Sequence, residues 1–216
     1  MENSVHTIPL LPLSEVVFFP KTLLPLFVYE PRYQLMLAHC LAGDRRLGIV
    51  LLRNGYDPDA YWNGPVFRVL CVGKVIDEEK LADGNYNILI EGMERAQIIQ
   101  EVQQKPYRVA QVESLQDFIE EKKKGELNEA VKQLMRLCNH LGVLFPQHED
   151  TLKSIFASHL HPGIIVDIIS YTFVQGQYER QCILSELNIV RRIRLVQVQL
   201  KHLIRRYSKE PYPDFL

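Results

Sequence analysis

The feature that most constrains the fold is a change in the spacing of apolar residues along the chain. In the first half they form short segments separated by proline and glycine, which is typical of β-strands joined by turns. In the second half they recur every three or four residues, which is the spacing of amphipathic helices. Strands followed by helices predict an α+β protein with two subdomains.

Seven short segments of the first half are expected to be strands. They span residues 7–13, 24–29, 47–52, 66–76, 86–91, 96–102 and 107–112. Asp83-Gly84 is expected to form a turn, and Gly92 a bulge or a tight bend. One helix is predicted to interrupt the strands, beginning at Pro31 and ending at Gly43. Strands at this spacing indicate a small mixed β-barrel or sandwich.

The second half is expected to be entirely helical. A charged stretch at residues 120–125 marks the change, and the predicted subdomains are 1–117 and 118–216. Helices are predicted over residues 127–141, 152–160, 164–169 and 183–204. Gly142 is expected to end the first of them, and Pro211 and Pro213 cannot continue the last.

Composition excludes several classes of protein. Among 216 residues the formal net charge is −1, which argues against a dedicated nucleic-acid binder. The four cysteines are scattered without a C-x-x-C pair, so we expect reduced, packed thiols.

The first residues do not resemble a signal peptide, and no apolar run approaches the ~20 residues of a membrane span. The expected location is therefore the cytoplasm.

Common catalytic motifs are missing from the sequence. There is no phosphate-binding G-x-x-x-x-G-K-[ST], no G-x-G-x-x-G and no G-x-S-x-G. His148-Glu149 begins like a zinc-protease helix, but Leu152 stands where the second histidine is required. His159 and His161 could place two imidazoles together, yet a role at a helix end is the better interpretation. We therefore predict no catalytic residue, no metal and no cofactor. A serine–lysine pair that meets only in space stays an alternative.

The last predicted helix is basic. Its cations are Arg191, Arg192, Arg194, Lys201, Arg205 and Arg206. Positive charge near the carboxyl end of a helix is favourable to the helix dipole, which is the simpler explanation. The alternative is a surface for an anionic partner such as nucleic acid, although Tyr207 is the only aromatic residue there.

Two apolar segments are the candidate binding residues. The first surrounds prolines in an expected turn and contains Phe18, Phe19 and Leu23. The second is a loop at residues 54–64 with turn chemistry, and it contains Tyr56, Tyr61 and Trp62. Exposed aromatic side chains on loops favour contacts with partners. The alternative is that Phe18 and Trp62 fold back onto the core.

The ordered motifs resemble the amino-terminal substrate-binding domain of the Lon protease family. The motifs are I-P-L-L-P-L at 8–13, V-F-F-P at 17–20, F-V-Y-E-P-R-Y at 27–33, I-E-G-M-E-R-A at 90–96, P-Y-R-V-A at 106–110, V-D-I-I-S at 166–170 and R-Q-C-I-L at 180–184. The resemblance spans nearly the whole chain. It departs from the family pattern at Lys74-Val75 and in the aromatic loop. In the E-P-R-Y block we expect structural roles, with Glu30 capping the helix and pairing with Arg32 or Arg95.

The resemblance implies a PUA-like mixed β-barrel subdomain with one inserted helix, followed by an all-α subdomain. It also implies a non-catalytic module that binds unfolded or partly folded polypeptide, and a free-standing copy without the ATPase and protease domains. No membrane partner is expected, nucleic acid is an unlikely partner, and self-association is compatible with this interpretation. The alternatives are an RNA-binding PUA-like protein, by analogy of fold alone, and an uncharacterised hydrolase.

Overall fold

The computed structural model describes residues 5–53, 64–102, 106–121, 124–158 and 160–208. The chain divides into two compact units, Met1–Gln116 and Asp117–Leu216, and each is described by itself. Within the described ranges, no helix is long and apolar enough to cross a membrane.

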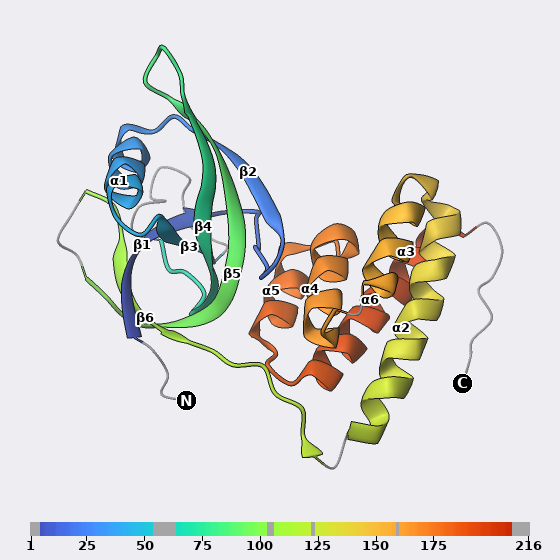
Figure 1. The fold of residues 1–216 in the computed structure, drawn as a ribbon. Helices are drawn as coiled ribbons and strands as arrows, with labels where there is room; N and C mark the ends of the chain where they lie inside the picture. Colours follow the sequence, from blue (N-terminus) through green and yellow to red (C-terminus); the bar gives the residue numbers. More distant parts are fainter. Residues whose placement is uncertain (1–4, 54–63, 103–105, 122–123, 159, 209–216) are drawn as a thin grey trace. The chain divides into compact units, whose positions relative to one another are not determined.

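The first unit, called the β unit, is a mixed sheet. Its strands are β1 (Val5–Leu13), β2 (Leu23–Val28), β3 (Arg46–Leu51), β4 (Val69–Lys80), β5 (Tyr86–Glu101) and β6 (Val109–Ser114). The strand order is β2-β5-β4-β3-β1-β6, and a further β5–β6 pairing closes β5, β4, β3, β1 and β6 into a ring (Figure 1). β1 and β3 are parallel and the other pairs are antiparallel. Helix α1 (Pro31–Ala42) follows β2, as the proline and glycine signals predict.

The strands bury their alternate side chains in a common core. The core cluster consists of Ile8, Leu10, Val50, Leu70, Val72, Ala96, Ile98, Ala110 and Val112. Residues two apart in a strand point to the same face, so apolar alternation is enough to build this cluster from five strands.

The two strands predicted at 86–91 and 96–102 form one strand, β5, of 16 residues. Opposite it, Val72 pairs with Glu94 and Gly73 pairs with Gly92, so Met93 is an extra residue. This is a β-bulge beside the predicted position, and it bends the strand without ending it. Gly92 is required there because a Cβ at this position would lie 2.1 Å from the carbonyl oxygen of Phe19.

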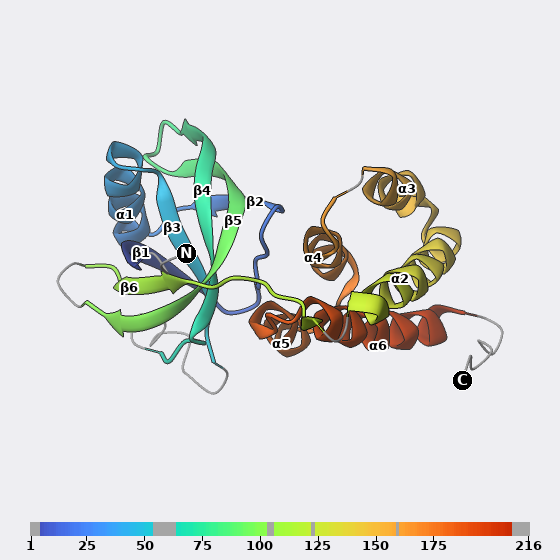
Figure 2. The same ribbon diagram turned by 60° about the horizontal axis from the view of Figure 1, so that its bottom comes forward.

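The second unit, called the helical unit, is a group of packed helices. They are α2 (Lys124–Leu144), the short 3-10 helix η3 (Pro146–His148), α3 (Glu149–Ala157), α4 (Pro162–Phe173), α5 (Gln177–Ser185) and α6 (Ile189–Tyr207). Figure 2 shows α6 running along the unit, packed against α2 and α4. α2 continues past Gly142 to Leu144, so the predicted end of this helix was wrong.

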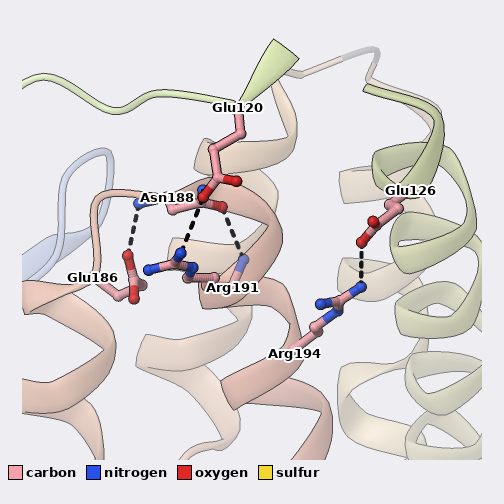
Figure 3. A network of polar contacts seen from close by, with 6 residues as sticks. All are labelled: Glu120, Glu126, Glu186, Asn188, Arg191 and Arg194. Atoms are coloured by element: carbon pink, nitrogen blue, oxygen red, sulfur yellow. Dashed lines mark hydrogen bonds and ion pairs between the residues drawn. The ribbon is translucent and has the colours of Figure 1, made fainter. Parts of the chain in front are cut away.

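The single long helix predicted at 183–204 was also wrong, because α5 and α6 are separate. Asn188 is the N-cap of α6, and its side chain accepts a hydrogen bond from the Arg191 amide at 3.1 Å. Its own amide donates to Glu186 at 2.8 Å (Figure 3). A capping asparagine stops the helix from extending towards the amino terminus, although the apolar spacing continues across the break.

Candidate functional site

Phe18 and Phe19 are inside the β unit, with 1% and 0% of their surface exposed. This burial agrees with the alternative in which Phe18 folds back onto the core, and it leaves neither ring on the surface. The turn that follows them is fixed to β5, because the Lys21 amide donates to the Gly92 carbonyl at 2.8 Å. The Thr22 hydroxyl donates to the Phe19 carbonyl at 2.7 Å. These bonds hold both rings towards the core, a constraint that a turn-forming sequence alone does not reveal.

Leu23 is exposed, and it begins an apolar surface along β2. Phe27 and Tyr29 extend this surface, with 53% and 61% of their area exposed. Their rings stack with centroids 6.0 Å apart. Among the described strands, β2 pairs only with β5, so it lies at an edge of the sheet. The sequence predicted Leu23 as a binding residue but not Phe27 or Tyr29, although strand alternation places residues 23 and 27 on one face.

The other predicted binding residues cannot be placed in this surface. Tyr56, Tyr61 and Trp62 lie outside the described residues.

A cavity of about 310 Å³ adjoins the exposed strand. It lies between the end of β1, the end of β2 and the start of α1. Its apolar lining includes Leu11, Pro12, Leu13, Leu26, Phe27 and Val28. Its polar and aromatic lining consists of Ser14, Tyr29, Glu30, Arg32 and Tyr33. A volume at the lower end of the range for ligand sites suits a few side chains of a partner.

The charges beside the cavity balance each other. Arg32 Nη2 lies 2.5 Å from Glu30 Oε2, and the guanidinium lies 4.8 Å from the centre of the Tyr33 ring. Of the two expected partners of Glu30, the structure shows Arg32. Glu30 occupies the N-cap position of α1, but its side chain makes no capping hydrogen bond, so that expectation was wrong. Burial raises the pKa of the Tyr33 phenol, which stays neutral at physiological pH. The Glu30–Arg32 pair and the neutral phenol therefore give this side of the cavity polar groups without a net charge.

Metal ligands do not gather in the described part of the chain. No group of three or more histidine, cysteine, aspartate or glutamate side chains there could hold a metal ion. His161 instead caps α4, since its Nδ1 accepts a hydrogen bond from the Gly163 amide at 3.3 Å. The exposed residues Leu23, Phe27 and Tyr29, together with the cavity that Phe27 and Tyr29 line, are called the apolar site. This site suits binding by shape and apolar contact.

Comparison with known proteins gives a family match over most of the chain. Residues 7–202 match the model of the ATP-dependent protease La (LON) substrate-binding domain. A Lon protease of Dictyoglomus thermophilum is 24% identical over 198 residues, which cover 90% of this chain and 24% of that protein. A Lon protease of Cytophaga hutchinsonii is 30% identical over 126 residues, covering 58% of this chain and 15% of that protein. The chain therefore spans about a quarter or less of these relatives.

Solved structures show the same fold. The N-terminal domain of a Mycobacterium avium complex Lon protease superposes with a TM-score of 0.67 at 15% identity, covering 91% of this chain and 98% of that one. A Lon N-terminal domain protein from Xanthomonas campestris gives 0.61 at 16% identity, covering 89% and 98%. The predicted α+β class, with strands before helices, is confirmed by these neighbours.

Proposed function

The chain belongs to the LON substrate-binding domain family, and on that premise we propose that it binds unfolded or partly folded polypeptide through the apolar site of the β unit. The observation that carries the proposal is the exposure of Leu23, Phe27 and Tyr29, of which Phe27 and Tyr29 also line the cavity. Apolar residues exposed together, next to a cavity that can accept a side chain, are typical of partner-binding surfaces.

The chemistry of the site favours an apolar segment over a charged ligand. Glu30 and Arg32 neutralise each other, so neither sign of charge is selected. A partner would gain free energy mainly by removing apolar surface from water, at roughly 25 cal/mol per Å². Unfolded chains expose such side chains and folded proteins bury them, which gives the proposed preference for unfolded polypeptide.

We propose further that the chain acts as a non-catalytic module in the cytoplasm, without ATP hydrolysis or proteolysis of its own. The chain matches only 24% of the length of the Dictyoglomus thermophilum Lon protease, and in this proposal those activities belong to the part that it does not match. In this proposal Tyr56, Tyr61 and Trp62 remain additional contact residues. Replacing Trp62, the only tryptophan, by alanine is expected to weaken binding without unfolding the protein.

The test measures the binding of a fluorescently labelled, reduced and carboxymethylated polypeptide by anisotropy. The variant carries Phe27→Ser and Tyr29→Ser. The control is Ile99→Ser, because Ile99 is 44% exposed in the same unit but does not line the cavity. We expect the double variant to weaken binding about tenfold or more, from the apolar area lost, while the control stays near wild type. Equal affinity of the folded double variant and the control would overturn the assignment of the site.

A further inference from the structure

The cavity of the apolar site lies along the edges of two strands. Residues 11–14, at the end of β1, and residues 26–29, at the end of β2, line it without a gap in either run. Successive side chains of a strand point to opposite faces, so a cavity lined by every residue of a run lies along the edge of the strand. β3 occupies one edge of β1 here and β5 occupies one edge of β2, so the cavity adjoins the other two edges.

The sheet leaves these two edges open. β6 pairs with β1 only through Val5–Pro9, after which the Leu10 amide donates to the Arg108 carbonyl at 2.9 Å. Beyond Leu10, β1 pairs with β3 alone among the described strands. β2 pairs only with residues 86–91 of β5, whereas β6 pairs with residues 96–101 (Figure 1). β6 therefore closes one end of the ring, and at the other end no described strand pairs with the edges that adjoin the cavity.

The register of β2 on β5 decides which backbone groups face the open edge. The Gly92 amide donates to the Thr22 carbonyl at 2.9 Å, so these two residues form a hydrogen-bonded pair. Such pairs recur at every second residue of an antiparallel ladder, and the residues between them turn their N–H and C=O groups away from the partner strand. On β2 the residues between are Leu23, Pro25 and Phe27. Pro25 has no N–H and presents a carbonyl alone, whereas Phe27 presents both groups.

We infer that the apolar site binds an extended segment of unfolded polypeptide as an added strand on the open edge of β2. The segment donates amide hydrogens to the carbonyls of Pro25 and Phe27, and one of its carbonyls accepts from the Phe27 amide. Alternate side chains of a strand share a face, so the site prefers apolar residues at every second position of the segment. The inference rests on the proposed function and adds that the polypeptide is held by its backbone, which all sequences share.

The probe is a fluorescein-labelled peptide of alternating valine and alanine with lysine at each end, and its binding is followed by anisotropy. Two further peptides keep these side chains but carry ester oxygens in place of N–H, one at three valines and the other at three alanines. Because the N–H groups of alternate residues point to opposite edges of a strand, each set removes donors from one edge. We expect one set to weaken binding about tenfold, since it removes the hydrogen bonds donated to β2, and the other to stay within about threefold of the parent peptide.

Phe27 supplies a test from the side of the protein. Phe27→Pro removes the N–H that the segment accepts from, and β2 keeps its bonds to β5 because this N–H faces away from β5. Phe27→Val is the matched control, since its side chain is similar in size and its N–H remains. We expect the proline variant to bind the parent peptide severalfold more weakly than the valine variant. In the unmodified protein, the bound peptide is expected to slow hydrogen exchange of the Phe27 amide, measured by NMR.

Three outcomes count against the added strand. Equal affinities of the two ester peptides, whether strong or weak, overturn the inference, as does unchanged exchange at Phe27 in the saturated complex. The proposed function survives these results if the carboxymethylated polypeptide still distinguishes the variant with Phe27→Ser and Tyr29→Ser from the Ile99→Ser control. Loss of that distinction refutes the polypeptide site, and the added strand with it.

Discussion

Arg192 and Asp167 form an ion pair inside the helical unit, with Nη1 of the arginine 3.1 Å from Oδ1 of the aspartate. Both side chains are withdrawn from water, at 0% and 2% exposure. Nη2 of the same guanidinium lies 2.5 Å from Oδ2 of Asp117, in an ion pair that is not well aligned as a hydrogen bond. One buried cation thus joins α4, α6 and the segment that enters the helical unit.

Removing one member of this buried group is expected to destabilise the protein strongly. Asp167→Asn leaves the Arg192 charge with less compensation, and breaking such a pair costs about 3–5 kcal/mol. Urea unfolding of the variant measures this loss. The control is Lys153→Met, which breaks the solvent-exposed pair with Glu149 and is expected to change stability little. Similar urea midpoints for Asp167→Asn and Lys153→Met would show that the buried pair contributes no more to stability than the exposed pair.

The N-cap of α6 is expected to contribute to stability on its own. Asn188→Ala removes the bond to the Arg191 amide and the bond that Asn188 Nδ2 donates to Glu120 at 3.0 Å. Loss of a capping side chain costs about 0.5–2 kcal/mol. Asn139→Ala, at an exposed position of α2, is the control and is expected to be neutral or slightly stabilising. Chemical denaturation of both variants measures how much the Asn188 cap stabilises the start of α6. A loss for Asn188→Ala no greater than that for Asn139→Ala would contradict this role.

Gly92→Ala is expected to destabilise the β unit. The added methyl group would meet the Phe19 carbonyl oxygen at 2.1 Å, so the bulge or the turn must move, at a cost of about 1–3 kcal/mol. Gly125→Ala is the control, because nothing lies within 4 Å of its added Cβ and it lies in a helix. That change is expected to be neutral or stabilising by up to about 1 kcal/mol. Thermal unfolding that ranks the two variants the other way round would contradict the packing argument.

Stability is expected to fall at alkaline pH. Burial raises the pKa of the Cys138 thiol from 9.0 to about 12, and that of Cys40 to about 11. These thiols stay protonated in the folded protein while the unfolded chain loses their protons above pH 9.0, so their contribution is full below that pH. Between pH 9 and 11 each thiol lowers the free energy of unfolding by up to about 1.4 kcal/mol per pH unit. Urea unfolding between pH 9 and 11 measures this loss of stability. In the Cys138→Ala variant the free energy of unfolding is expected to decline less steeply with rising pH.

The two units differ in how far the sequence could predict them. Alternating apolar residues predicted the strands, and the proline and glycine at the ends of α1 predicted its bounds within a residue. The continuous apolar spacing from Ile183 to Ile204 hid the break at Asn188, because periodicity records which face is buried and not whether the helix is continuous. Gly92 suggested a bend, but only pairing with β4 decides that β5 continues through it.

The residues of the proposed binding site show the same division. Sequence alone placed apolar residues around prolines, and it determined the family and the order of the elements. It could not separate Phe18 and Phe19, which are buried, from Leu23 and Phe27, which are exposed. Exposure depends on which neighbour covers a side chain, and here hydrogen bonds from residues distant in sequence hold the turn against β5. The sequence therefore determined the order of strands and helices, because the spacing of apolar residues controls local secondary structure. Tertiary packing alone decided which of these apolar residues are exposed.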